Sequence, residues 1–225
     1  MTKVIAFDVN ETLLDLRVLD EPFADLLGDA KLRPLWFAQM LQLSFVGGLT
    51  GQYVDFSQAQ EAALRMVAAR LGREVSTSEV IEMIARMNSL PPHPEVPAAL
   101  ERLASSDLVV VALVNSLHSV GEQQLTNAGI RAHFHSVISA DEVKALKPGP
   151  APYRKVAANH EVAVEEVRLV AAHSWDISGA LAAGCRAAFV ARPGMVLSPI
   201  GAQPDIIGQD VAEVVDQILA QGTEG

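Results

Sequence analysis

The chain has little of three things: cysteine, positive charge and long apolar runs. Its single cysteine, Cys185, excludes a disulfide bond within the chain. Lysine and arginine total 17 against 27 acidic residues, which gives a net charge of -10 and no clustered basic surface for nucleic acid. No uninterrupted apolar stretch approaches the roughly 20 residues that span a membrane. The residues before Asp8 lack the segments of a secretory signal, so we expect a cytoplasmic protein that binds neither nucleic acid nor a membrane.

Half of the 225 residues are apolar, and their spacing changes along the chain. From Asp15 to about Leu90, apolar residues recur three and four positions apart, which is typical of amphipathic helices. Gly47, Gly48 and Gly51 interrupt this pattern and suggest a turn between two of the helices. The region therefore predicts a group of helices and no strand.

The proline-rich segment at 91–94 cannot continue a helix, and after it short apolar runs alternate with helical segments. Strands are expected at 4–6, 108–114, 136–138, 167–172 and 187–190, and helices at 96–104, 119–128, 150–158, 177–183 and 211–220. Continuous apolar strands that alternate with helices predict a parallel sheet covered on both faces. We therefore predict an α/β fold: a doubly wound, Rossmann-like core made of residues 1–14 and 91–225, with residues 15–90 inserted after the first strand as a helical cap.

Four of the predicted strands lead into polar residues of different chemistry. Asp8 follows the first strand, Asn115 and Ser116 follow the second, Lys147 lies beyond the third, and the segment 173–176 follows the fourth. The carboxyl ends of parallel strands meet at one edge of the sheet, where open α/β folds bind their ligands. These groups are therefore expected to converge.

Four motifs carry most of this chemistry: Asp8-Val9-Asn10-Glu11-Thr12-Leu13-Leu14-Asp15, Val114-Asn115-Ser116, Lys147-Pro148 and Trp175-Asp176. Together they resemble the haloacid dehalogenase superfamily, and most closely the type II 2-haloacid dehalogenases, over nearly the whole chain. The resemblance implies a metal-independent hydrolase that converts short 2-haloalkanoic acids into 2-hydroxy acids through an ester on Asp8. It also implies that Lys147 lies beside this nucleophile and that Asp176 positions Lys147 and the hydrolytic water.

Each of these candidate catalytic residues also has a structural interpretation. Asp8 is able to cap the turn after its strand, and Lys147 would be an exposed loop residue, as most lysines are. Asp176 is able to cap the N-terminus of a helix that starts near Ile177. The occurrence of all the motifs together favours the catalytic interpretation, with Asp8 as a nucleophile that forms a covalent ester.

Six residues are predicted to contact the substrate: Asn10, Phe37, Asn115, Ser116, His173 and Trp175. Asn115 and Ser116, with the backbone amides that begin the next helix, form a candidate cradle for a substrate carboxylate. Trp175 either walls the pocket or packs in the core. His173 stands where some family members carry an asparagine, which implies contact with substrate or water.

Two positions depart from the family's pattern. Phe37 follows Trp36 where the family typically carries an arginine that helps to receive the halide, and Arg33, one helical turn earlier, is a candidate replacement. Val114 stands where the superfamily usually has a hydroxyl that binds the anionic group of the substrate, and valine has no donor. Anion binding should weaken by roughly 1 kcal/mol or more unless Ser116 or backbone amides compensate.

Asn10 distinguishes the competing functions. Many superfamily phosphatases carry an aspartate at this position, two residues after the nucleophile, which protonates the leaving oxygen; asparagine cannot do so. A halide leaves without a proton, so Asn10 favours a dehalogenase over a Mg²⁺-dependent phosphatase of small metabolites. A third alternative is a catalytically impaired binding homologue that has kept the fold.

Cofactors and partners follow from the same residues. The segment 173–176 offers one carboxylate, whereas a hard cation normally needs several oxygen ligands, so we expect no required cofactor or metal. Weak Mg²⁺ binding through Asp8 and Asp176 stays open. The expected partner is a small anionic substrate, and the apolar cap helices leave a homodimer open.

Overall fold

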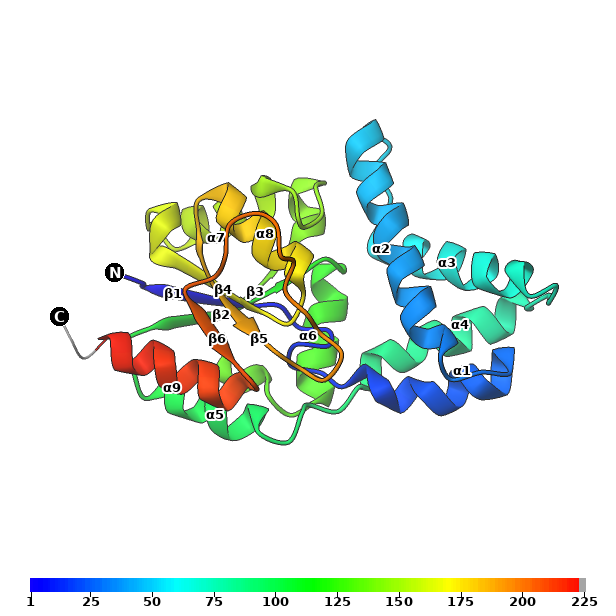
Figure 1. Cartoon of the computed structure of the whole chain (residues 1–225), viewed down its shortest axis with the longest axis horizontal. Coiled ribbons are helices and arrows are strands. Elements are labelled where there is room, and N and C mark those ends of the chain that lie inside the picture. Colours follow the sequence, from blue (N-terminus) through cyan, green and yellow to red (C-terminus); the bar gives the residue numbers. More distant parts are fainter. Residues whose placement is uncertain (223–225) are drawn as a thin grey trace.

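A six-stranded parallel sheet forms the centre of the larger part of the molecule in the computed structural model, which describes residues 1–222 (Figure 1). Its strands are β1 (Val4–Phe7), β2 (Val109–Val114), β3 (Ser136–Ser139), β4 (Val167–Ala171), β5 (Arg186–Val190) and β6 (Ile206–Gly208). They lie in the order β3-β2-β1-β4-β5-β6, and all neighbouring pairs are parallel. The order reverses beside β1, which is where such sheets bind ligands. The predicted doubly wound α/β fold is confirmed, and β6 is an additional strand.

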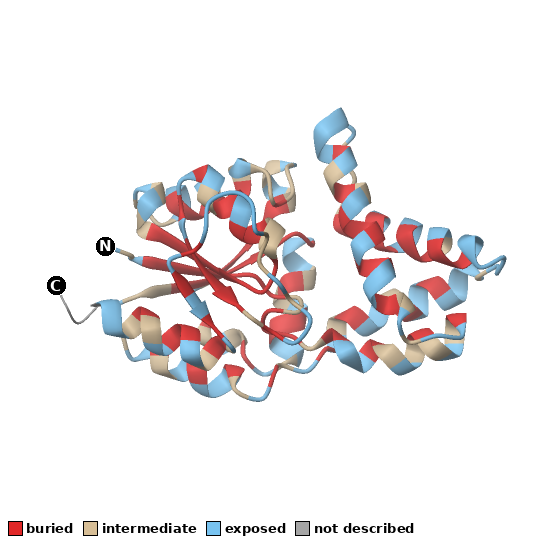
Figure 2. Ribbon diagram, viewed as in Figure 1, coloured by how far each residue is buried: buried red, intermediate tan, exposed pale blue. Residues whose placement is uncertain are grey.

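Helices cover both faces of the sheet. On one face lie α5 (Val96–Ala104), α6 (His118–Asn127) and α9 (Val211–Gly222), and on the other lie α7 (Pro150–Asn159) and α8 (Ser174–Ala183). Side chains of β1 alternate between the faces, so Ile5 and Phe7 pack into the first layer and Val4 and Ala6 into the second. All four residues of β1 are buried, as Figure 2 shows for the strands of the sheet, and a strand buried on both faces has to be apolar along its length.

The helices between β1 and α5 form a separate group to one side of the sheet (Figure 1). They are α1 (Asp20–Leu27), α2 (Leu32–Thr50), α3 (Phe56–Arg70) and α4 (Thr77–Ala85), with 3₁₀ turns at Leu16–Leu19 and Arg86–Ser89. Trp36, Leu64 and Val67 are fully buried in this part of the chain. We propose residues 15–90 as a cap domain and residues 1–14 and 91–225 as the core domain, whose last three residues lie outside the described part.

The turn expected from Gly47, Gly48 and Gly51 begins at Gly51, and only its placement at Gly47 and Gly48 is wrong, because α2 continues through both glycines to Thr50. The helix ends at Gly51, whose φ of 69° is a left-handed conformation that glycine adopts without steric cost. Gly47 serves a different purpose, since a Cβ there would lie 2.8 Å from the carbonyl oxygen of Gln52. The missing side chain lets the returning chain pass close to the helix.

Two connecting segments, residues 8–15 and 91–95, run side by side between the core and the cap. The Asp15 amide donates to the Pro91 carbonyl at 2.8 Å, and the His93 amide donates to the Leu13 carbonyl at 2.9 Å. The first of these segments is also the continuation of β1. The carboxyl end of the central strand is therefore the point at which the sheet meets the cap.

Candidate functional site

Asp8 lies where β1 ends. Its amide donates to the Val170 carbonyl at 3.0 Å, which keeps β1 in register with β4 up to this residue. Three donors hold its buried carboxylate: Thr12 Oγ1 at 2.7 Å and His173 Nδ1 at 3.0 Å from Oδ2, and Lys147 Nζ at 2.8 Å from Oδ1. Groups from the loops after β3 and β4 thus converge on the end of β1.

The surroundings of Asp8 keep its carboxylate ionised. Burial alone would raise the pKa of Asp8, but the Lys147 ammonium and the His173 ring outweigh it and hold the pKa well below its ordinary value. At neutral pH Asp8 therefore carries a full negative charge while its side chain is almost inaccessible to bulk water. An ionised, poorly hydrated carboxylate is suited to attack carbon as a nucleophile.

Lys147 links the two acids of the site. Its Nζ lies 2.8 Å from Asp8 Oδ1 and 2.7 Å from Asp176 Oδ2, and its side chain is 1% exposed, so its interpretation as an exposed loop lysine is wrong. Burial lowers the pKa of Lys147, but the carboxylates of Asp176 and Asp8 outweigh this and hold the pKa above its ordinary value. The lysine is therefore charged and in direct contact with Asp8.

The loop that carries Lys147 is held by Asn115 and by the close approach of α8. Asn115 Oδ1 accepts from the Lys147 amide at 2.8 Å, and Asn115 Nδ2 donates to the Lys147 carbonyl at 3.4 Å. Gly179 of α8 lies against the same loop, where an added Cβ would be 2.6 Å from both Pro148 Cβ and Tyr153 Oη. The side-chain amide of Asn115, expected to bind substrate, here positions the lysine.

Asp176 lies inside the first turn of α8. The helix begins at Ser174, earlier than the start expected near Ile177, so the interpretation of Asp176 as N-cap is wrong. Its Oδ1 accepts a hydrogen bond from the Tyr153 hydroxyl. Burial raises the pKa of Asp176, and the Lys147 ammonium lowers it only in part. Burial likewise raises the pKa of Tyr153 well above its ordinary value, so its hydroxyl stays a donor.

Three residues of this cluster were not expected from the sequence: Glu11, Thr12 and Tyr153. Glu11 and Thr12 belong to the same motif as Asp8, three and four residues after it, so their closeness to Asp8 could have been predicted from the sequence. Tyr153 lies six residues after Lys147, in α7. Which side of α7 faces Asp176 depends on how the helix packs against α8, and no local sequence pattern predicts that.

His173 joins Asp8 to a chain of charged groups that reaches into the cap. Its Nε2 lies 2.9 Å from Glu11 Oε2, Arg33 lies 3.1 Å from Glu11 Oε1, and Arg33 Nε donates to Asp20 Oδ1 at 2.6 Å. Burial disfavours the charged imidazole, but the hydrogen bonds to Asp8 and Glu11 outweigh it and raise the pKa of His173 to about 9. Arg33 therefore binds the carboxylates of Glu11 and Asp20 and does not contact Asp8. The cation that contacts Asp8 Oδ2 is His173.

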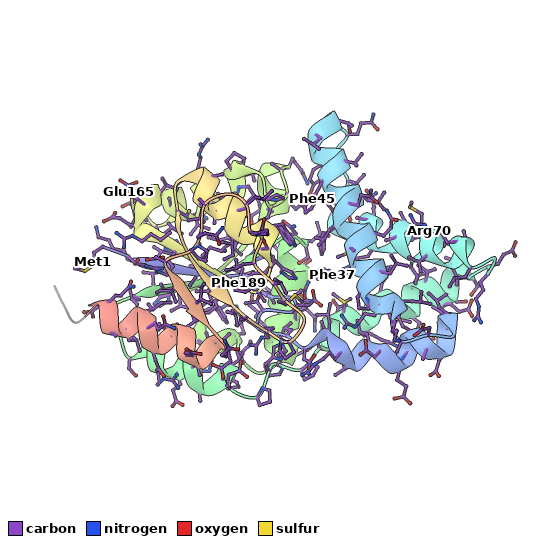
Figure 3. The ribbon with its side chains drawn as sticks, viewed as in Figure 1. Met1, Phe37, Phe45, Arg70, Glu165 and Phe189 are labelled. Carbon is purple, nitrogen blue, oxygen red and sulfur yellow. The ribbon has the colours of Figure 1, made fainter. Side chains whose placement is uncertain are left out.

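A small cavity of about 20 Å³ lies over Asp8, which is room for one water molecule. Its lining combines Asp8, Val9, Asn10, Val114, Asn115, Lys147, His173 and Trp175 from the core with Phe37, Leu41 and Phe56 from the cap. Phe37 lies where α2 faces the core (Figure 3), and its ring stacks on His173 with centroids 5.6 Å apart. His173 stacks in turn on Trp175, with centroids 5.2 Å apart. The cap is closed over Asp8, so a ligand larger than water requires its side chains to move.

Two buried donors at the site have no hydrogen-bond partner within residues 1–222: Ser116 Oγ and Trp175 Nε1. Trp175 lines the cavity, and Ser116 follows the cavity residue Asn115 in the chain. Buried polar atoms are normally paired, so both donors are free to bind a ligand or a water molecule. Val114 lines the cavity without offering a donor, and Asn10 Oδ1 accepts from a core glutamine, Gln124.

The acids of the site do not fit a divalent cation. The position that Asp8 and Asp176 share is taken by Lys147 Nζ, within 2.8 Å of an oxygen of each. In the described part of the chain, no group of three or more His, Cys, Asp or Glu side chains is arranged to hold a metal. Mg²⁺ would have to displace the ammonium to bind both carboxylates.

The chain is similar to proteins of known activity over most of its length. Residues 5–190 match the family model described as haloacid dehalogenase-like hydrolase. The chain is 31% identical to (S)-2-haloacid dehalogenase 2 of Pseudomonas sp. strain CBS-3, with 89% of each chain covered. It is 29% identical to (S)-2-haloacid dehalogenase H-109 of Pseudomonas putida, with 96% and 97% covered. The solved structure of L-2-haloacid dehalogenase from Xanthobacter autotrophicus matches with a TM-score of 0.91 at 25% identity, covering 97% of this chain and 99% of that one.

Proposed function

This chain belongs to the haloacid dehalogenase-like hydrolase family, and from that premise we propose that it hydrolyses short 2-haloalkanoic acids to 2-hydroxy acids through an ester on Asp8. The observation that carries the proposal is the state of Asp8, an ionised carboxylate buried beneath apolar cap side chains. Position 10, where a phosphatase would need an acid, is an asparagine. The names of the relatives, which give 2-haloacids as substrates, support the substrate class.

In the first half-reaction, an oxygen of Asp8 attacks C2 of the haloacid from the side opposite the halogen. A carbon–oxygen bond forms, the carbon–halogen bond breaks, and its electron pair leaves with the halide, so no proton has to be delivered. Thr12 and Lys147 hold the carboxylate during the attack. Closure of the apolar cap side chains keeps water from the nucleophile. The product is an ester with inverted configuration at C2.

The substrate also needs donors for its carboxylate and positive charge for its halide. Ser116 Oγ and the backbone amides before α6 are the proposed carboxylate ligands, because this hydroxyl is buried and has no partner among the described residues. The His173 imidazolium and Trp175 Nε1 are the proposed halide ligands. They would replace the arginine that the family typically carries at the position of Phe37.

In the second half-reaction, water attacks the ester carbonyl carbon of Asp8 and releases the 2-hydroxy acid. Lys147 Nζ lies on Asp8 Oδ1, where it can stabilise negative charge that develops during this attack. Asp176 and Tyr153 hold the lysine in that position as a hydrogen-bonded series. One carboxylate oxygen of Asp8 therefore enters the first product, and an oxygen from water replaces it.

We further propose that the reaction needs no metal. The alternative within the superfamily, a Mg²⁺-dependent phosphatase of small metabolites, requires a proton for its leaving oxygen, and Asn10 is no acid. The ammonium of Lys147, which already neutralises charge between Asp8 and Asp176, supports the same conclusion. Phosphate release that depends on added Mg²⁺ would contradict it.

Two properties of the whole molecule are also proposed. Within residues 1–222 no helix is both long and apolar enough to cross a membrane. A cytoplasmic location accords with the free cysteine, Cys185. A homodimer would cover the free end of α2, where Val46 and Leu49 are exposed (Figure 2). Light scattering should give a dimer for the wild type and a monomer for Leu49→Asp.

The test of the proposed function is halide release from L-2-chloropropionate and chloroacetate in the presence of EDTA. We expect release by the wild type and none by Asp8→Asn. A single turnover in ¹⁸O-water should give a first product without solvent oxygen, because that oxygen comes from Asp8. Solvent label in the first product would exclude the ester, and an equally active Asp8→Asn variant would exclude Asp8 as the nucleophile.

A further inference from the structure

Gln124 is a buried glutamine of α6 whose side chain contacts two other segments of the chain. Its Nε2 donates to the Met87 carbonyl at 2.8 Å and to Asn10 Oδ1 at 3.1 Å. Its Oε1 is buried and has no hydrogen-bond partner within residues 1–222. The NH₂ group therefore makes every hydrogen bond that this side chain has in the described part of the protein.

The Met87 carbonyl determines which way the Gln124 amide is turned. A carbonyl oxygen accepts and cannot donate, so the atom of Gln124 that lies against it has to be the nitrogen. The second hydrogen of this NH₂ group is then available to Asn10, and the atom of Asn10 that meets it has to be the acceptor, Oδ1. The reverse orientation of Asn10 would place two NH₂ groups against each other. The backbone of the Arg86–Ser89 turn thus sets the orientation of Asn10 through Gln124.

The NH₂ group of Asn10 is left without a partner by this arrangement. Asn10 lines the cavity over Asp8, and its oxygen is turned to Gln124. Its Nδ2 is the other terminal atom of the same amide and has no hydrogen-bond partner among residues 1–222. An NH₂ group offers two donors and no acceptor. The atom of this amide that remains for a ligand is therefore a donor.

Asn10 and Gln124 lie close to the position at which a hydroxyl donor is missing. Val114 and Asn10 line the same cavity. Helix α6 packs against Val114, since a Cβ on Gly121 would lie 3.0 Å from Val114 Cγ2. Gln124 follows Gly121 by three residues, which places both on the same side of the helix. The proposed carboxylate ligands, Ser116 Oγ and the backbone amides before α6, belong to the segment that joins Val114 to this helix.

We propose that Asn10 Nδ2 donates to the carboxylate of the 2-haloacid, and that Gln124 is the positioning residue that keeps this donor turned to the cavity. The donor would replace the hydroxyl that the superfamily usually carries at the position of Val114. This inference rests on the proposed dehalogenation and adds to it a ligand for the anionic group of the substrate. Gln124 contacts neither the substrate nor the reacting atoms, so it acts through Asn10.

The proposed donor should affect substrate binding and not the chemical steps. The carboxylate of the haloacid keeps its charge through both half-reactions, so a donor to it stabilises the bound substrate and the transition state about equally. Loss of such uniform binding raises KM and leaves kcat nearly unchanged. A hydrogen bond to a charged group changes affinity by about 10-fold or more. The same loss should therefore appear in the affinity for a carboxylate that cannot react.

The test compares Gln124→Leu and Asn10→Ala with the wild type in steady-state halide release from L-2-chloropropionate. We expect Gln124→Leu to raise KM about 10-fold with kcat within about threefold, because Asn10 loses the partner that orients it. Asn10→Ala should raise KM at least as much. Gln123→Leu is the matched control on α6 and should keep the wild-type KM, since Gln123 is exposed and its side chain contacts Asn127.

Gln124→Glu tests the orientation itself. Its carboxylate has nearly the shape of the amide but accepts where Gln124 donates, so Asn10 should turn Nδ2 toward it and Oδ1 toward the cavity. An oxygen that faces the substrate carboxylate repels it, so KM should exceed that of Gln124→Leu. In the Asn10→Ala background the same substitution should raise KM less, because no amide is left to turn.

A double variant separates positioning from a structural role. Gln124→Leu combined with Asn10→Ala should have the KM of Asn10→Ala alone, because Gln124 acts through Asn10. Effects of the two substitutions on KM that multiply would overturn the positioning role, since Gln124 would then act independently of Asn10.

Binding of propionate, a carboxylate without a halogen, is measured on the same proteins by ligand-observed NMR and does not depend on turnover. Gln124→Leu and Asn10→Ala should each bind propionate about 10-fold more weakly than the wild type. Wild-type values of both KM and propionate affinity in Gln124→Leu would overturn the role of Gln124 and leave dehalogenation through Asp8 standing. A wild type that releases no halide would overturn the dehalogenation, whereas the propionate affinities decide whether Asn10 and Gln124 bind a carboxylate.

Discussion

The two walls of the site differ in what holds them. On the core wall, Lys147 lies between the carboxylates of Asp8 and Asp176, and each of these acids has a further donor of its own. The cap wall consists of Phe37, Leu41 and Phe56, which present carbon surface to the cavity. The core thus holds paired charges at the site of the proposed chemistry, whereas the cap side chains present no charge that would be left unpaired if they moved away.

The walls also differ in the free-energy cost of losing one member. A buried ion pair is tolerated only while both partners are present, because an unpaired charge keeps its desolvation cost. Carbon atoms removed from an apolar wall lose their burial, about 25 cal/mol per Å². Substitutions on the core wall should therefore have larger effects than substitutions on the cap wall.

Asp8→Asn, on the core wall, should have the largest effect on activity. We expect turnover to fall at least about 10⁴-fold, because the amide cannot form the ester, as is typical for the loss of a nucleophile. The fold should remain, since asparagine has nearly the same shape and still accepts from Thr12. Halide release and circular dichroism measure the two effects. Turnover within tenfold of the wild type would assign the attack to another group.

Lys147→Met should destabilise the fold by about 3–5 kcal/mol, because it leaves two buried carboxylates without their shared cation. Urea unfolding at neutral pH measures this difference. Lys144→Met is the matched control three residues away, since the Lys144 side chain is 65% exposed in its ion pair with Asp141. The control should change stability by less than about 1 kcal/mol. Equal losses of stability in the two variants would contradict the proposed difference between the buried and the exposed lysine.

Gly179→Ala should cost about 1–3 kcal/mol and lower kcat, because its Cβ would lie 2.6 Å from Pro148 and push the lysine loop away. Gly48→Ala supplies the comparison within the cap, since no atom lies within 4 Å of a Cβ there. In the helical setting of α2 it should stabilise by about 0.5–1 kcal/mol. Thermal unfolding and steady-state kinetics on both variants test this pair.

His173→Asn should make stability less sensitive to alkaline pH. Contacts with Asp8 and Glu11 raise the pKa of His173 from 6.5 to about 9 against the effect of burial, so the protonated ring stabilises the folded state fully below pH 6.5. This contribution is lost as the pH rises through about 9. Urea unfolding at about pH 6 and about pH 9.5 should show a larger decrease for the wild type than for the variant. Parallel decreases would mean that the ring is neutral in the folded protein.

Phe37→Leu on the cap wall should have the smallest effect. It replaces a ring that stacks on His173 by an aliphatic side chain and leaves every charge in place. We expect a KM change of a few fold and a kcat within about threefold, because an aromatic pair contributes about 0.5–1.5 kcal/mol. Steady-state kinetics with L-2-chloropropionate measures both constants. A kcat reduced as strongly as in Asp8→Asn would assign Phe37 a part in the chemical steps.

The core elements could be predicted from the sequence because a strand buried on both faces has to be apolar along its length. Each expected core strand and helix occurs within a few residues of its place. Ile206–Gly208 was missed, since three residues are too few to show a pattern. The turn predicted from Gly47, Gly48 and Gly51 starts only at Gly51, because α2 continues through the first two glycines and the returning chain needs the space at Gly47. Because α8 starts at Ser174 and not near Ile177, Asp176 lies in the first turn of the helix and is not its N-cap.

The sequence by itself determined which chemical groups follow the strands: the acid at Asp8, the amide at Asn115 and the cation at Lys147. Their positions after the strands can be predicted because the pattern of apolar residues shows where each strand ends. Only the tertiary structure decided that His173 spans Asp8 and Glu11, residues 165 and 162 positions away from it. Such contacts depend on how α8, the segment after β1 and the cap pack together, and no local pattern encodes that packing.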